Sequence, residues 1–178
     1  RLAGIRGPGL VVVHPEEKVQ QIIDLRPQVR AFHLTARTED GIQIRVRAAV
    51  AFRINAGRRT PTLGQPLPFR RAAAFRAIRA QRVEHDSEEG PAPALSQRLW
   101  DDLPGIVGEH ILRDRLSKLT FDALYATHRL EGDLPRRTIR ERLSERLQEA
   151  LEPIGIQLLD VHLGNLEPAN PDIYVRRA

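Results

Sequence analysis

The fold is decided by residues 42–54, which read IQIRVRAAVAFRI. Every second residue from Ile42 to Ile54 is apolar, so all of these side chains fall on one face of an extended chain. The opposite face is mostly polar and carries Gln43, Arg45, Arg47, Arg53 and Asn55. Such alternation predicts a long antiparallel strand with one face against a core and an arginine-lined face in water.

Three shorter strands are predicted before this stretch, over residues 10–13, 19–25 and 29–38. Residues 10–13 are an apolar run that lies between Gly7-Pro8-Gly9 and Pro15. The second predicted strand ends before Pro27. The third leads into the turn Glu39-Asp40-Gly41. Glycine accepts the positive φ of a tight turn, so a hairpin should join this strand to residues 42–54.

The middle of the chain is predicted to be helical, over residues 69–82, 99–111, 120–125 and 133–151. Thr120 is an expected N-cap, Asp133 and Pro135 open the last helix, and Pro153 and Gly155 end it. The apolar spacing marks Ala72, Phe75 and Ile78 (with Arg79) in the first helix, Leu99, Leu103, Ile106, Val107 and Ile111 in the second, and Ile139, Leu143, Leu147, Ala150 and Leu151 in the last.

A final strand is predicted over residues 156–163, where the alternation slips and indicates a bulge near Leu158-Leu159. Strands, then helices, then a returning strand indicate an α+β fold: a largely antiparallel, curved sheet with helices packed on one face and a closing C-terminal strand. Residues 56–68 are proline- and glycine-rich and predict a loop, and we expect a mobile, acidic insertion around residues 85–98.

Composition excludes several classes of protein. The 178 residues contain no cysteine, which excludes a disulfide scaffold, a thiolate zinc site and a cysteine nucleophile. The formal net charge is +5, but residues 1–82 carry 16 basic and 5 acidic groups whereas residues 83–178 carry 12 basic and 18 acidic groups. This split suits a surface that touches anionic lipid or nucleic acid, and it also suits copies that pack basic half to acidic half. Solvated arginine on exposed strand and helix faces is an equal alternative.

No catalytic, metal-binding or nucleotide-binding motif emerges, and we expect no enzyme, no cofactor and no metal. The histidines are scattered without metal-ligand spacing. A hydrolase that uses His110 or His128 with Ser117 or Ser144 is the enzymatic alternative. Nucleic-acid binding is not expected, because the arginine face has no interleaved aromatic side chains on which bases could stack. No run of about 20 apolar residues could cross a bilayer.

Taken in order, the motifs resemble the SPFH (band-7) domain of stomatins, prohibitins and flotillins. The matching stretches are Gly7-Pro8-Gly9-Leu10, Ile23-Asp24-Leu25-Arg26-Pro27-Gln28, Thr38-Glu39-Asp40-Gly41-Ile42, Val50-Ala51-Phe52-Arg53-Ile54, Leu112-Arg113 with Leu116, and Gly155-Ile156 with Val161 and Leu163. We therefore expect an N-terminally incomplete SPFH domain over residues 1–168, and an exit segment over residues 169–178 leading toward a coiled coil outside the chain.

The resemblance implies a non-enzymatic scaffold associated with the cell membrane and anchored by a segment outside this chain. It implies a homo-oligomer that assembles side by side into a ring or cage and organises a membrane microdomain. The alternative is a regulatory binding module for a membrane protease or channel.

Two sets of residues follow as candidate contacts. Gly7, Pro8, Gly9, Leu10, Val11, Val12 and Val13 are expected nearest the lipid surface, unless residues 10–13 are simply core. Arg45, Arg47, Arg53 and Arg113 are the candidate subunit contacts.

Overall fold

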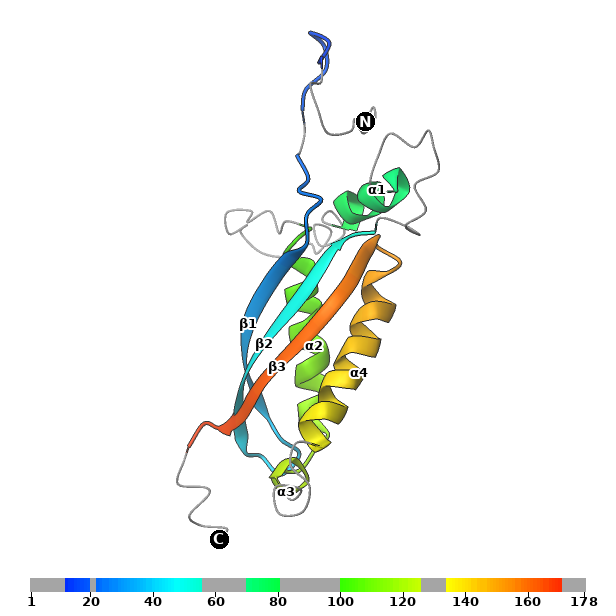
Figure 1. Ribbon diagram of the computed structural model, residues 1–178. Coiled ribbons are helices and arrows are strands. Elements are labelled where there is room, and N and C mark those ends of the chain that lie inside the picture. The colour runs from blue at the N-terminus through cyan, green and yellow to red at the C-terminus, as the bar shows by residue number, and fades with distance from the viewer. Residues whose placement is uncertain (1–11, 20–21, 56–69, 81–99, 126–133, 171–178) are drawn as a thin grey trace.

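The computed structural model describes residues 12–19, 22–55, 70–80, 100–125 and 134–170, which form a three-stranded sheet and four helices (Figure 1). The strands are β1 (Gln28–Arg37), β2 (Gln43–Ile54) and β3 (Ile156–Pro168). The helices are α1 (Arg71–Ala80), α2 (Leu103–Ser117), α3 (Phe121–Tyr125) and α4 (Leu134–Leu151). The architecture is α+β, as the sequence predicts.

The sheet is antiparallel in the order β1-β2-β3, so the strand with the strict alternation is its centre. The predicted hairpin joins β1 to β2, with Gly41 at φ 83°. The buried Thr38 stabilises this turn: its hydroxyl accepts a hydrogen bond from the Ile42 N–H at 3.0 Å and donates to the Asp40 carboxylate at 2.6 Å.

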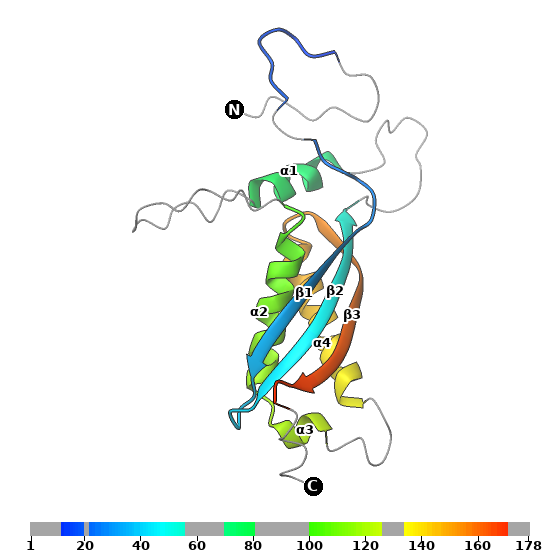
Figure 2. The same ribbon diagram turned by 90° about the vertical axis from the view of Figure 1, so that its left-hand side faces the viewer.

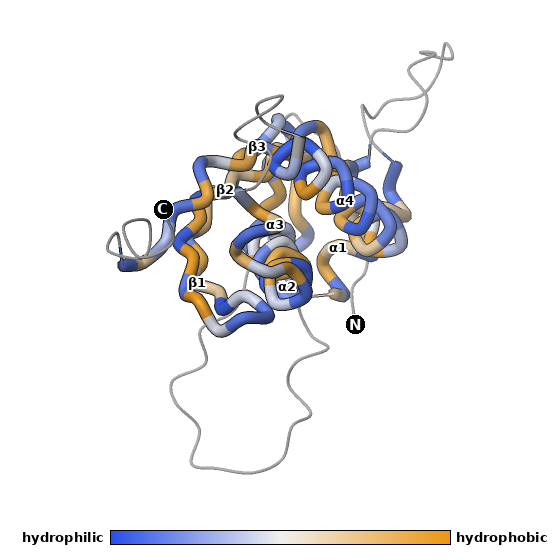
Figure 3. Tube along the Cα trace, turned by 90° about the horizontal axis from the view of Figure 1, so that it is seen from below, coloured by the Kyte–Doolittle hydropathy of each residue, from blue (hydrophilic) through white to orange (hydrophobic). Residues whose placement is uncertain are grey.

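Helices α2 and α4 lie side by side against one face of the sheet, α2 beneath β1 and α4 beneath β3 (Figures 1 and 2). Helix α1 lies at one end of the strands and α3 at the other, beside the hairpin. Seen along the strands, the molecule has two layers, one of sheet and one of helices (Figure 3). None of the described helices covers the second face of the sheet.

The core lies between these layers. The inner residues of β2, from Ile44 to Ile54, are all buried and pack with leucines of α2 and α4, namely Leu112, Leu116, Leu143 and Leu147. Trp100 closes one end of the core by packing edge-on against Phe52, with ring centroids 6.1 Å apart. Burial of these aliphatic side chains is the main favourable term for folding.

Helix α2 turns a different face to the sheet than the apolar spacing predicts. Its buried residues are Pro104, Gly105, Gly108, Leu112 and Leu116, whereas Leu103, Ile106, Val107 and Ile111 are only half-buried. A Cβ at position 108 would lie 3.1 Å from the Phe32 ring of β1. The glycines therefore let α2 approach β1 closely, and this close contact decides which face is buried.

Other predictions need correction at single positions. Val12 and Val13, and residues 22–25, belong to no strand, so the strands predicted over 10–13 and 19–25 are wrong where the structure describes them. Pro15 and Pro27 lack the N–H that a paired strand would donate. Ala72 and Ala150 are exposed rather than buried. The expected insertion at 85–98 and the loop at 56–68 lie outside the described residues.

Strand β3 is longer than predicted and contains two irregularities. Ala51 faces Asp160 but Phe52 faces Leu158, so the predicted bulge is confirmed and Leu159 is the extra, exposed residue. The second irregularity lies where Val46 faces Leu166 but Ala48 faces Leu163. Apolar alternation does not reveal this second bulge, which falls at Gly164-Asn165.

Gly155 forms the tight connection between α4 and β3. Its φ is 84°, and a Cβ there would overlap the backbone of Ala73 in α1. Its carbonyl also accepts the Asn55 N–H at 3.0 Å, at the end of β2. This glycine therefore joins α1, β2 and β3 at one point.

We predict that Gly155→Ala lowers the free energy of unfolding by about 2–5 kcal/mol, because the strained φ and the overlap with α1 add. Gly41→Ala is the matched control: its φ is similarly positive, but a Cβ there has nothing within 4 Å, so it should cost only about 1–2 kcal/mol. Urea unfolding followed by the fluorescence of Trp100, the single tryptophan, measures both. Equal losses would contradict a role for the α1 contact.

Candidate interaction surfaces

The described residues before β1, 12–19 and 22–27, form a leading segment that exposes large apolar side chains. Val12, Val19 and Ile22 are 78%, 64% and 87% exposed, which is unusual for aliphatic residues. Of the predicted membrane-proximal residues, Val12 and Val13 are thus at the surface and not in the core, while Gly7 to Val11 lie outside the described residues. The segment lies at the end of the sheet that carries α1, opposite the hairpin (Figure 1).

An ion pair shapes this segment just before the sheet begins. The guanidinium of Arg26 donates from Nε to both Asp24 carboxylate oxygens at 3.1 and 3.0 Å, and from a terminal nitrogen at 2.6 Å. The Arg26 N–H also donates to Asp24 at 3.0 Å. These hydrogen bonds favour the charged carboxylate, so they lower the pKa of Asp24 from 3.8 to about 2 although both side chains are exposed.

The outer face of the sheet brings Arg45 and Arg47 together, as the strand alternation predicts. Both are exposed, and the register sets Arg47 opposite His33 of β1 and Arg45 between Thr35 of β1 and Glu167 of β3. Toward the α1 end, β1 and β2 present mostly small apolar side chains on this face, and the exposed Asp160 and His162 of β3 flank them. This apolar part consists of Val29, Ala31, Ala49 and Ala51, of which Val29 is 63% exposed.

The other two arginines of the predicted subunit contact are placed differently. Arg53 lies on the outer face but is half-buried, and its Nε donates to Gln157 of β3 at 3.0 Å. Arg113 belongs to the helical layer, where it donates to Glu109 one turn earlier at 2.6 Å. The structure therefore joins Arg45, Arg47 and Arg53 on one face and separates Arg113 from them.

The structure contains two long-range polar contacts that the sequence did not predict. Arg30, on the inner face of β1, binds the carboxylates of Asp101 and Asp102 before α2. Asp40 in the hairpin accepts the Phe121 N–H at 3.1 Å and so caps α3 together with the predicted Thr120. Neither pairing has a local signal, because the partners are about 70–80 residues apart.

The residues of the alternative hydrolase do not form a catalytic set in the described part of the chain. His110 and Ser117 lie two turns apart on α2, and the Ser117 hydroxyl donates to the carbonyl of Asp114 at 2.9 Å. Ser144 lies on α4, and His128 is outside the described residues. Among the residues that the structure describes, no group of three or more histidines, aspartates and glutamates could hold a metal ion. None of the described helices has the length and apolarity to span a bilayer.

Residues 1–63 match the model of the SPFH domain / Band 7 family. The match runs through the leading segment, β1 and β2, and it confirms the resemblance for the motifs up to Ile54. The SPFH family is a membrane-associated scaffold family and is generally non-enzymatic. No curated protein matched the chain.

The Asp24–Arg26 pair yields a pH prediction. A carboxyl group whose pKa is lowered in the folded state stabilises that state above its ordinary pKa of 3.8, and the contribution disappears as the pH falls to about 2. Carboxyl ¹³C shifts should therefore show Asp24 still ionised near pH 3, and Arg26→Gln should raise its pKa toward 3.8. An unchanged Asp24 titration in Arg26→Gln would refute the assigned cause.

Proposed function

We propose that this chain is a non-enzymatic, membrane-associated scaffold domain that oligomerises side by side into a ring or cage and so organises a membrane microdomain. The observation that carries the proposal is the match of residues 1–63 to the SPFH family together with a sheet face that none of the described helices covers. That face offers a neighbouring copy a small apolar area beside two exposed arginines.

The lipid side of the proposal rests on the leading segment. Aliphatic side chains as exposed as Val12, Val19 and Ile22 lose unfavourable contact with water when they enter an interface. They lie at one end of the sheet, so lipid contact there would leave the outer face of the sheet free for neighbouring copies. In this arrangement Gly7, Pro8, Gly9, Leu10 and Val11 are further candidates for membrane contact.

The subunit side rests on charge. A neighbour that presents carboxylates from the acidic half, residues 83–178, would complement Arg45 and Arg47. Exposed ion pairs contribute only about 0–1 kcal/mol each, so the apolar contacts beside them must supply much of the affinity. The small side chains of Ala31, Ala49 and Ala51 permit a close approach of the partner.

We predict that Arg45→Glu/Arg47→Glu dissociates the oligomer of the natural full-length protein, because the substitutions place like charges opposite the acidic half. Mass photometry in detergent or in nanodiscs should show a shift to smaller species. Arg137→Glu on α4 is the control, since Arg137 is exposed and pairs within its own helix at 2.9 Å. It should leave the oligomer intact.

Salt provides a second measurement of the same interface. Raising the concentration from about 0.1 M to above 0.5 M shortens the screening length from about 10 Å to below about 5 Å and should weaken assembly through these arginines. A protein that is monomeric in membranes at low salt would overturn the scaffold proposal. Capture of one stoichiometric protease or channel by such a monomer would instead favour the regulatory binding module.

A further inference from the structure

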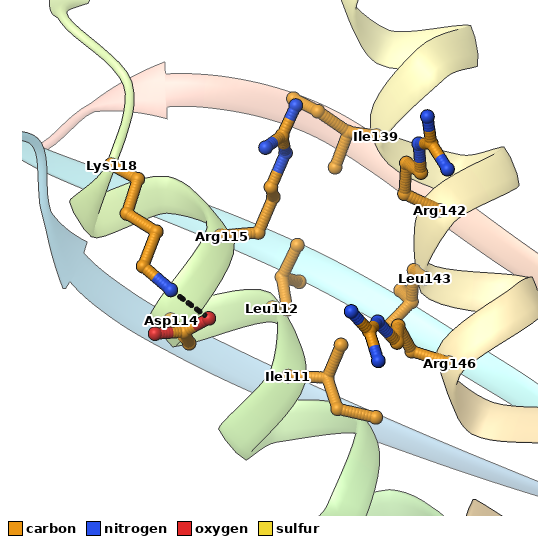
Figure 4. Close-up of a pocket in the computed structure, with 9 residues that line it drawn as sticks. All are labelled: Ile111, Leu112, Asp114, Arg115, Lys118, Ile139, Arg142, Leu143 and Arg146. Atoms are coloured by element: carbon orange, nitrogen blue, oxygen red, sulfur yellow. Dashed lines mark hydrogen bonds and ion pairs between the residues drawn. The ribbon is translucent and has the colours of Figure 1, made fainter. Parts of the chain in front are cut away.

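A basic groove runs between α2 and α4 on the helical layer, away from the open face of the sheet (Figure 4). Its volume is about 320 Å³, at the small end of the range for ligand sites. Helix α2 contributes Ile111, Leu112, Asp114 and Arg115 to the lining, and Lys118 follows directly after this helix. Helix α4 contributes Ile139, Arg142, Leu143 and Arg146. The floor is therefore aliphatic, while the walls carry the charged side chains.

The charges of the groove do not balance. Four of its side chains are cationic and only Asp114 is anionic, and that carboxylate already accepts a hydrogen bond from Lys118 Nζ at 2.7 Å. No other carboxylate among the lining residues balances the guanidinium groups of Arg115, Arg142 and Arg146. Figure 4 shows Arg115 and Arg146 reaching into the space between the two helices, one from each side.

Arg115 differs from the other two arginines because part of its guanidinium group is buried. It is half-buried, its Nε is shielded from solvent, and that nitrogen has no hydrogen-bond partner among the residues that the structure describes. A buried donor without a partner costs free energy, and more so on a charged group. An anion bound in the groove would place acceptor oxygens beside this guanidinium and neutralise its charge.

Arg142 and Arg146 are engaged only weakly. Arg142 donates to Glu145 at 3.1 Å and Arg146 to Glu149 at 3.3 Å, and both pairs are exposed at the surface. Each guanidinium has five N–H donors, so one such bond leaves most of them free for a ligand. Exposed pairs of this kind contribute little and are readily exchanged for a more highly charged anion.

We propose that this groove binds a phosphate monoester through Arg115, Arg142 and Arg146. Planar guanidinium groups recognise phosphate by paired hydrogen bonds, and three of them around one small cavity suit a compact dianion with several acceptor oxygens. The aliphatic floor, Ile111 above all, would contact the carbon part of the ester. The phosphate could be carried by a soluble metabolite or by a lipid headgroup, and the inference does not depend on the proposed scaffold function.

Titration calorimetry and ³¹P NMR with glycerol phosphate test the soluble source. Flotation with phosphatidylcholine vesicles, with and without phosphatidic acid, tests the lipid source. Binding in either assay should weaken about tenfold or more in Arg115→Gln and in Arg146→Gln, because each removes a charged donor. Arg115→Lys keeps the charge but loses the planar fork, and it should bind with intermediate affinity.

The matched control is Arg113→Gln, which removes the same charge from the same helix but outside the groove. It should bind like the wild type, and a circular dichroism melt of every variant shows that the fold is retained. An equal loss in Arg113→Gln, or no binding of either phosphate probe by the folded wild type, would overturn the proposal. Tighter binding of polyglutamate than of glycerol phosphate would also overturn it and assign the groove to an acidic protein partner.

Discussion

The inner face of β2 is the constraint on which the rest of the structure depends. As the central strand it is paired on both sides, and its inward side chains from Ile44 to Ile54 are all removed from water. One helical layer is enough to cover that face, and α2 and α4 provide it. The outer face of the same strand carries the exposed Arg45 and Arg47, so the alternation that builds the core also creates a charged surface that no described helix covers. The fold and the proposed subunit contact are thus two consequences of one pattern.

Local patterns explain what could be predicted from the sequence. The hairpin at Gly41, the long central strand, the Thr120 cap and the bulge at Leu159 each depend on a few neighbouring residues. The buried face of α2 does not, because it is chosen by how closely Gly105 and Gly108 approach β1. The spacing of apolar residues predicts the buried face of a helix from its large side chains. It cannot reveal a face that is buried because glycines allow a close contact. The strands predicted before β1 were wrong for a related reason. A short apolar run forms a strand only when a neighbouring strand is available to pair with it, and composition does not reveal that.

The candidate surfaces also differ in whether a local pattern could predict them. Strand alternation is enough to place Arg45, Arg47 and Arg53 on one face, and the structure does so. Arg113 could be assigned to a layer only once the orientation of α2 was known. The basic groove was not predictable, because its residues come from two helices that meet only after the chain has folded. Each arginine taken alone has the appearance of an ordinary solvated side chain, and the excess of positive charge becomes visible only when the lining is complete.

The pairing of charges in the helical layer sets Arg115 apart from its neighbours. Arg113, Lys118, Arg137, Arg142 and Arg146 each bind a carboxylate one turn away on the same stretch of helix, which neutralises the surface locally. Arg115 has no such neighbour and is the one drawn partly into the space between α2 and α4. Because the buried Nε of Arg115 lacks a partner among the described residues, an anion bound between the helices, as we propose, would stabilise this layer. Because the groove and the open face of the sheet belong to different layers, such a ligand would brace α2 against α4 while the sheet remained free to meet another surface.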